Sequence, residues 1–168
     1  MGSGTHKTNT PKNLNIAVIS ASSTRREPAE DKSGIWIKNQ AKKEGHEVVI
    51  HRTVPDDRDS ISELVTQTTL KIGPDIIIIT GGTGIARKDV TIEAVQPLFS
   101  KTLTAFGPLF AQLSFEQIDS AAILSRAAAG IIDSTVVFCI PGSLNACKLA
   151  CRELIFPELG HLVKHIRE

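Results

Sequence analysis

Hydrophobic and polar positions follow two patterns along this chain, and together these patterns predict strands separated by helices. Short apolar runs at residues 14–20, 46–51, 75–79 and 134–140 are typical of β-strands. Between most of these runs, apolar residues recur at three- and four-residue steps, which is typical of amphipathic helices. Strand–helix alternation predicts an α/β fold, a three-layer sandwich with a mostly parallel sheet.

The predicted helices occupy residues 31–44, 57–72, 91–101, 106–115, 143–155 and 159–166. Asp31 and Gly45 suit the start and the end of the first helix, and either Asp56 or Asp57 can cap the second. Residues 21–30 are polar and suit a long loop. Residues 1–12 are small and polar, so we expect a disordered amino-terminal tail followed by one domain over 13–168.

The segment after the isoleucine run is the most informative part of the chain. Four consecutive isoleucines predict a strand buried on both faces, and ligands bind outside the carboxyl ends of such strands. The loop that follows consists of Gly81, Gly82, Thr83 and Gly84. Its backbone N–H groups can approach an anion closely. A plain tight turn is the alternative, but it does not explain Arg87, Lys88 and Asp89, which suit a phosphate ester with its divalent metal.

Composition excludes several classes of protein. The net charge is +1, and the aromatic residues are six Phe and one Trp with no Tyr, so neither a basic face nor a base-stacking platform for nucleic acid is expected. No apolar run is long enough to span a bilayer. The three cysteines are an odd number and suit buried free thiols in a reducing cytoplasm. Cys147 and Cys151 lie four apart, but two further ligands for a zinc site are missing.

Several short motifs, in order, resemble those of the MoaB/MogA family, which includes the gephyrin G domain. The resemblance extends over residues 14–166 and is closer to MoaB. The motifs are Gly81-Gly82-Thr83-Gly84 with Asp89-Val90-Thr91 and Glu93-Ala94, Phe106-Gly107, Leu113-Ser114-Phe115, Leu124-Ser125-Arg126-Ala127, Pro141-Gly142-Ser143, and Leu154-Ile155-Phe156-Pro157-Glu158.

The resemblance implies a molybdopterin-binding fold and an adenylyl transfer in molybdenum cofactor biosynthesis. In that reaction the terminal phosphate of molybdopterin attacks the α-phosphorus of ATP and pyrophosphate leaves. The resemblance assigns catalysis and Mg²⁺ binding to Asp56 and Asp89. The residues expected to bind nucleotide or molybdopterin are Gly81, Gly82, Thr83, Gly84, Arg87, Lys88, Thr91, Ser125, Arg126, Pro141, Gly142 and Ser143.

Each of these assignments has a plainer alternative. Asp56, Asp89 and Ser125 could be helix caps. Arg87 and Lys88 could be solvated surface charges. The spacing of His161 and His165 permits a metal pair, but no third ligand is evident, so we expect surface or interface residues. Trp36 is expected to pack against the core.

Some positions depart from the family pattern. Pro108 and Ala111 stand where a Glu and an Arg are common, Leu144 replaces a Pro, and Asp119 replaces a Gly. These departures concern the pterin end of the expected site. The alternatives for function are a non-catalytic molybdopterin-binding protein of the MoaB type and a nucleotide hydrolase or amidase of the competence-damage type. The resemblance also implies a homo-oligomer, a hexamer or a trimer, and a molybdate-insertion protein as a partner.

Overall fold

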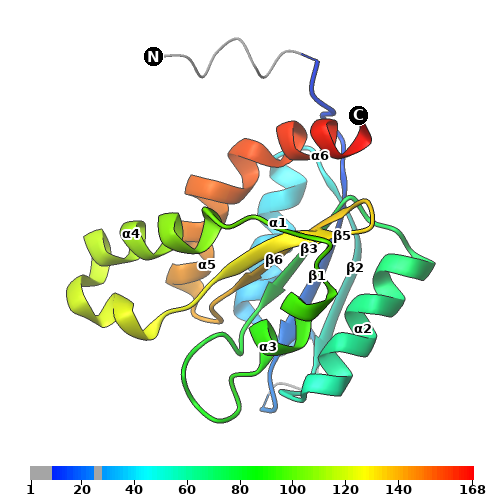
Figure 1. Ribbon diagram of the computed structural model, residues 1–168. Helices are drawn as coiled ribbons and strands as arrows, with labels where there is room; N and C mark the ends of the chain where they lie inside the picture. The colour runs from blue at the N-terminus through cyan, green and yellow to red at the C-terminus, as the bar shows by residue number, and fades with distance from the viewer. Residues whose placement is uncertain (1–8, 25–27) are drawn as a thin grey trace.

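A six-stranded mixed sheet forms the middle layer of the computed structural model, which describes residues 9–24 and 28–168 (Figure 1). The strand order is β2-β1-β3-β6-β5-β4. β2, β1, β3 and β6 are parallel, whereas β5 is antiparallel to both of its neighbours. The strands are β1 Asn15–Ala21, β2 Glu47–Val54, β3 Ile76–Thr80, β4 Lys101–Thr102, β5 Ala128–Ile132 and β6 Thr135–Ile140.

Helices cover both faces of the sheet and complete the predicted three-layer sandwich (Figure 1). One face carries α1, α4, α5 and α6, and the other carries α2 and α3. The helices are α1 Lys32–Lys43, α2 Arg58–Lys71, α3 Thr91–Val95, α4 Phe106–Ile118, α5 Leu144–Ala150 and α6 Leu159–Arg167. Short 3₁₀ segments lie at Pro28–Glu30, Gln96–Leu98, Asp119–Leu124 and Phe156–Glu158, and a π-helical turn at Cys151–Ile155.

The isoleucine strand is buried on both faces, as predicted. Ile76 and Ile78 pack on the side of α1 and α5, while Ile77 and Ile79 pack on the side of α2 and α3. All four are fully buried. Successive side chains of a strand point to opposite faces, so an unbroken apolar run is what a doubly covered strand requires.

The helix ends confirm part of the sequence reading. The Asp31 side chain caps α1 by accepting from Gly34 N at 2.9 Å, and Gly45 follows that helix with φ +88°. Asp57, and not Asp56, caps α2, since its carboxylate accepts from Ser60 N at 2.8 Å. Asp56 is therefore not required as a helix cap.

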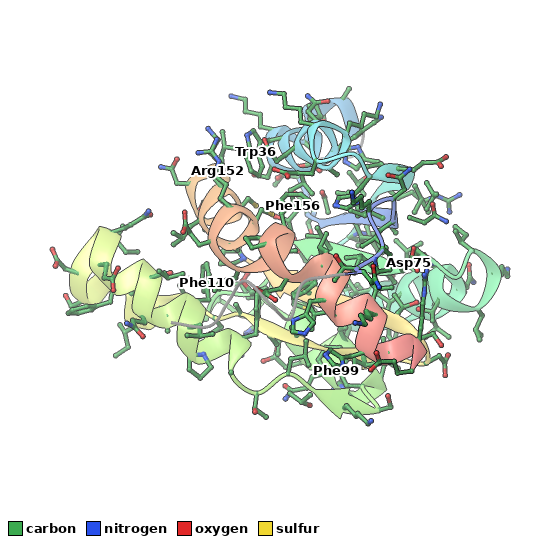
Figure 2. All side chains as sticks on the ribbon, turned by 90° about the horizontal axis from the view of Figure 1, so that it is seen from above. Trp36, Asp75, Phe99, Phe110, Arg152 and Phe156 are labelled. Carbon is green, nitrogen blue, oxygen red and sulfur yellow. The ribbon has the colours of Figure 1, made fainter. Side chains whose placement is uncertain are left out.

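Trp36 packs against the core as expected. Its ring is partly buried against the larger apolar cluster, and the Arg152 guanidinium lies 5.3 Å from the ring centroid. Figure 2 shows the two residues beside each other on the outer side of this helical layer. A cation over an indole ring is a weak but favourable contact.

Two helix boundaries predicted from the sequence were wrong, and one alternative is excluded. The helix expected over 91–101 ends at Val95, because Pro97 disfavours helical backbone before it, and the chain passes through a 3₁₀ turn into β4. The helix expected over 143–155 is α-helical only to Ala150 and then becomes a π-helical turn. Ser125 follows a 3₁₀ segment in extended conformation, so it is not a helix N-cap.

The strand β5 was not predicted. Its sequence Ala-Ala-Gly-Ile-Ile contains weak strand formers, and Gly130 weakens the pattern further. The structure explains this glycine, since a Cβ at Gly130 would collide with the ring of Phe99. Of the expected tail over 1–12, residues 1–8 lie outside the described residues.

Candidate active site

Three loops meet at the carboxyl edge of the parallel strands, and their glycines allow the close approach. Gly81 N donates to the carbonyl oxygen of Ile140 at 3.0 Å, which joins the loops after β3 and β6. A Cβ on Gly81, at φ +97°, would collide with the carbonyl oxygen of Ala21, and one on Gly142 would lie 3.1 Å from Gly81 Cα. Larger residues would push these loops apart.

Asp56 lies against the first half of the glycine loop. Its carboxylate accepts from Ser23 N at 2.7 Å, and its own N–H donates to Ser23 Oγ at 3.2 Å. A Cβ on Gly82 would lie 3.3 Å from Asp56 Oδ1 and would collide with the hydroxyl of Thr91. That hydroxyl donates to the Gly81 carbonyl oxygen at 2.8 Å. Asp56 therefore presents one carboxylate oxygen to the loop while the other is held by the loop after β1.

Asp89 lies against the second half of the loop. Its Oδ2 accepts from Ala86 N at 2.8 Å, and a Cβ on Gly84 would lie only 2.6 Å from that oxygen. The carboxylate thus folds back over residues 84–86. Asp89 does not cap α3, since the residue before that helix is Val90, with no side-chain cap.

Arg126 clamps the loop from the opposite side. Its Nε donates to the carbonyl oxygens of Thr83 at 2.9 Å and Gly84 at 3.0 Å. Its terminal nitrogens donate to the Glu93 carboxylate at 2.6 and 3.3 Å. The hydrogen bond raises the pKa of Arg126 and, against a smaller effect of burial, lowers that of Glu93. In this arrangement Arg126 binds loop carbonyls, so its first role is to hold the loop.

An open depression of about 330 Å³ lies beside this clamp. Its lining residues are Gly84, Ile85, Ala86, Asp89, Glu93 and Arg126. Glu93 belongs to one of the sequence motifs, but the sequence assigned it no role in binding or catalysis. Its position three residues into α3, facing an arginine that is far away in the sequence, could be learned only from the folded chain.

The remaining candidate residues lie in the loop after β6, in the strand-to-helix loop after β3 and beside Arg126. Pro141 and Gly142 join the site through their carbonyl oxygens. The Pro141 oxygen accepts from the Thr80 hydroxyl at 3.0 Å, and the Gly142 oxygen accepts from the Ser33 hydroxyl at 2.8 Å. Ser143 caps α5 through Ala146 N at 3.3 Å. Arg87 and Lys88 are exposed on the strand-to-helix loop, and Ser125 is half-buried beside Arg126.

A buried polar cluster under this edge was missed in the sequence. The Asp31 carboxylate accepts from the Ser20 hydroxyl and lies 3.1 Å from His51 Nε2. Burial would raise the pKa of Asp31, but hydrogen bonds from His51, Ser20 and Gly34 outweigh burial and lower it. A Cβ on Gly34 would collide with Asp31. The only sequence signal for this cluster was a histidine, His51, within the strand β2. Asp31 was expected to serve only as a helix N-cap.

The donor set fits a metal that is completed by the substrate. Among the described residues, no group of three or more His, Cys, Asp or Glu side chains could hold a metal ion. Mg²⁺ commonly takes only one or two carboxylates and fills the remaining positions with water and substrate phosphates. Asp56 and Asp89, which lie against Gly82 and Gly84 of one glycine-rich loop, fit that pattern.

The Thr83 hydroxyl is unusual. It is the one buried side-chain oxygen or nitrogen without a hydrogen-bond partner in the part of the chain that the structure describes. Leaving such a group unpaired costs about 1–3 kcal/mol. The deficit falls within the loop that is positioned to bind an anion.

The cysteines have the character expected from the sequence. All three cysteines are free and buried, and burial raises the pKa of the Cys139 thiol to about 12. In the described residues, no helix has the length and apolar character needed to cross a membrane.

Together the fold and the site define an α/β domain with a glycine-rich loop flanked by two carboxylates at the sheet's carboxyl edge. The chain belongs to the family described as "probable molybdopterin binding domain", whose profile matches residues 17–161. The resemblance seen in the sequence motifs is thus confirmed.

Two relatives match over nearly their whole length. Molybdenum cofactor biosynthesis protein B of Bacillus subtilis is 44% identical over 164 residues, which cover 97% of this chain and 96% of that protein. Molybdopterin adenylyltransferase of Pyrococcus furiosus is 42% identical over 173 residues, covering both proteins completely.

Solved structures agree with the fold. A crystal structure of molybdenum cofactor biosynthesis protein B superposes with a TM-score of 0.89 at 42% identity, covering 94% of this chain and 98% of that one. The tungsten cofactor synthesizing protein MoaB from Pyrococcus furiosus superposes with a TM-score of 0.84 at 41% identity, covering 94% and 99%. A CinA protein from Thermoplasma acidophilum, 16% identical with a TM-score of 0.60, shares the fold alone.

Proposed function

We propose that this chain is a molybdopterin adenylyltransferase of molybdenum cofactor biosynthesis. It transfers AMP from ATP to the terminal phosphate of molybdopterin and releases pyrophosphate. The observation that carries the proposal is the placement of Asp56 against Gly82 and Asp89 against Gly84, on either side of one glycine loop. The full-length similarity to a named adenylyltransferase supports it.

The chain's own groups have distinct tasks in this reaction. Backbone N–H groups of residues 82–84 bind phosphate oxygens of the nucleotide, while that of Gly81 is held by the Ile140 carbonyl oxygen. Arg126 and Glu93 keep the loop in the open shape that such binding needs. The Thr83 hydroxyl, unpaired in the described chain, is a further donor for a phosphate oxygen after a small loop adjustment.

Asp56 and Asp89 would hold Mg²⁺ together with the substrate phosphates. When bound, the ion neutralises charge on the α-phosphate and on the leaving pyrophosphate. The two carboxylates fix the position of the reacting phosphates, and Asp56 is itself fixed by the loop after β1 through Ser23. Positioning and charge neutralisation account for most of the rate enhancement in phosphoryl-group chemistry.

The residues proposed to bind the pterin and the triphosphate are assigned from their positions around the glycine loop. Ser125, Pro141, Gly142 and Ser143 lie at the same edge and are proposed to bind the pterin and its phosphate. Exposed Arg87 and Lys88 are proposed to meet the triphosphate as it enters. The reducing cytoplasm is the proposed compartment.

Assembly as a homo-oligomer is part of the proposal. Five of the nine large exposed apolar side chains in the described residues lie on α4 and the 3₁₀ segment after it: Leu109, Phe115, Ile118, Ile123 and Leu124. Figure 1 shows α4 extending away from the sheet. Exposed apolar side chains that are concentrated on one projecting element are typical of subunit interfaces. We favour a hexamer over a trimer, and a molybdate-insertion protein as the later partner.

The test is transfer of radiolabel from α-³²P-ATP to molybdopterin by the purified full chain. We expect labelled adenylylated molybdopterin that forms with Mg²⁺ and not in excess chelator. Binding of molybdopterin without transfer would instead establish a non-catalytic binding protein. Hydrolysis of dinucleotides without transfer would place the chain with the competence-damage hydrolases.

A further inference from the structure

Two histidines on α6, one in its first turn and one in its last, face each other across a short gap. His161 Nε2 and His165 Nε2 are 2.9 Å apart, and the ring centroids are 4.7 Å apart. The residues are four apart on a helix, so they lie on one side of it. This pair lies on α6, outside the residues assigned above to the glycine-loop site.

The outer nitrogens of both rings face carboxylates. His161 Nδ1 lies 3.2 Å from Glu158 Oε2, and His165 Nδ1 lies 3.2 Å from Glu168 Oε2. A carboxylate beside Nδ1 favours a hydrogen on that nitrogen, which therefore donates. In two neutral rings of this tautomer, both Nε2 atoms carry lone pairs. Two lone pairs at 2.9 Å repel each other unless a cation lies between them.

We propose that His161 and His165 form a chelating site for a borderline transition-metal dication such as Ni²⁺ or Zn²⁺. Imidazole nitrogens bind these metals at about 2.0–2.1 Å, and an ion at that distance from both Nε2 atoms subtends an angle of about 90°. That angle is the one between adjacent ligands in octahedral or square-planar coordination. Neutral imidazole with its second nitrogen bound to a carboxylate is the usual form of a histidine metal ligand.

The surroundings suit a cation and its entry. His165 lies in the last turn of α6, where the helix dipole favours positive charge. The exposed fractions of the side chains are 30% for His161 and 62% for His165, so water can reach the ion and fill its open positions. Arg167 is turned to Asp75, 2.7 Å away. Mg²⁺ prefers oxygen ligands and is not expected to bind here.

The experiment titrates chelator-treated full-length protein with NiCl₂, and separately with ZnCl₂, by isothermal calorimetry at pH 7.5. We expect saturation at this site by one ion per chain. His161→Ala and His165→Ala should each lower the affinity at least about a hundredfold, and Glu158→Gln and Glu168→Gln about tenfold, in line with losing groups that orient metal-bound imidazoles. Affinity should fall as pH drops, because protons compete for Nε2.

One control variant keeps the result specific. Lys164→Ala removes a charge from the same helix and should leave binding unchanged. Unchanged melting temperatures without metal show that the histidine variants are folded. The proposal is overturned if His161→Ala and His165→Ala bind as tightly as the wild type. It is equally overturned if the folded wild type binds neither ion and the rings merely share a proton.

Discussion

The two edges of the central sheet use aspartate in opposite ways. At the amino edge, Asp75 precedes β3, and its carboxylate accepts from Asn15 N at 2.9 Å and from Arg167 at 2.7 Å. At the carboxyl edge, Asp56 and Asp89 each accept from one backbone N–H and face glycines of the loop that is proposed to bind phosphate. Figure 2 labels Asp75 beside the far end of α6. A carboxylate with both oxygens engaged holds elements together, whereas a partly engaged one remains able to bind a ligand.

The largest expected effect is a loss of adenylylation rate when an aspartate at the carboxyl edge is changed. Asp89→Asn keeps the size of the side chain but removes its charge, so the adenylylation rate should fall by about a hundredfold, comparable to losing one preorganised electrostatic group. Rates are measured with α-³²P-ATP at saturating substrate. The melting temperature should change by no more than a few degrees, because the amide oxygen still accepts from Ala86 N. Wild-type rates would refute the catalytic assignment, and a collapsed melting temperature would indicate a structural role.

The next effect concerns the buried cluster beneath the carboxyl edge. Asp31→Asn should lower the free energy of unfolding at pH 7 by about 2 kcal/mol, because charged hydrogen bonds from His51 and Ser20 are lost. Denaturant titrations of both proteins measure the difference.

The same cluster predicts a pH dependence with a defined sign. The pKa of Asp31 is lower in the folded chain than in the unfolded chain. Its contribution is therefore complete above about pH 5, where the unfolded aspartate is also ionised, and is lost as pH falls through the lower folded pKa. The gap between wild type and Asp31→Asn should shrink between about pH 5 and pH 2. A gap that stays constant over this range would contradict the assignment.

A smaller effect is expected at the amino edge. Asp75→Asn should lower the free energy of unfolding by about 1 kcal/mol, since the pair with exposed Arg167 is lost but the contact with Asn15 N can persist. This corresponds to about 2–4 °C in melting temperature for a chain of this size. The adenylylation rate below the transition should equal that of the wild type. A large fall in the adenylylation rate of the folded Asp75→Asn variant would contradict a purely structural role for the amino edge.

The smallest effect lies outside both edges and has the opposite sign. Asp119 ends α4 with φ +52° and ψ −143°, a conformation that glycine adopts far more easily. Asp119→Gly should raise the free energy of unfolding by up to about 1 kcal/mol through relief of this strain. Thermal unfolding measures the change, with Asp133→Gly, at φ +51° in a β-turn, as the matched comparison.

Local patterns were enough to predict much of the fold. The isoleucine run, the Asp31 and Gly45 helix ends and the apolar periodicity of α1, α2 and α6 all appear where the sequence placed them. These features depend on interactions within a few residues, so a linear sequence contains them. β5 was missed because its alanines and Gly130 are weak strand formers, and it becomes a strand by pairing with β4 and β6.

The sequence by itself also determined the glycine loop and the motifs that resemble a molybdopterin-binding family. Only the tertiary structure decided how those residues are used. It assigned the α2 cap to Asp57 and turned Asp56 towards Gly82, it engaged Arg126 with loop carbonyls and Glu93, and it brought Ser20, Asp31 and His51 together. Hydrogen bonds between residues tens of positions apart depend on how strands and loops meet in space, and no local pattern encodes that meeting.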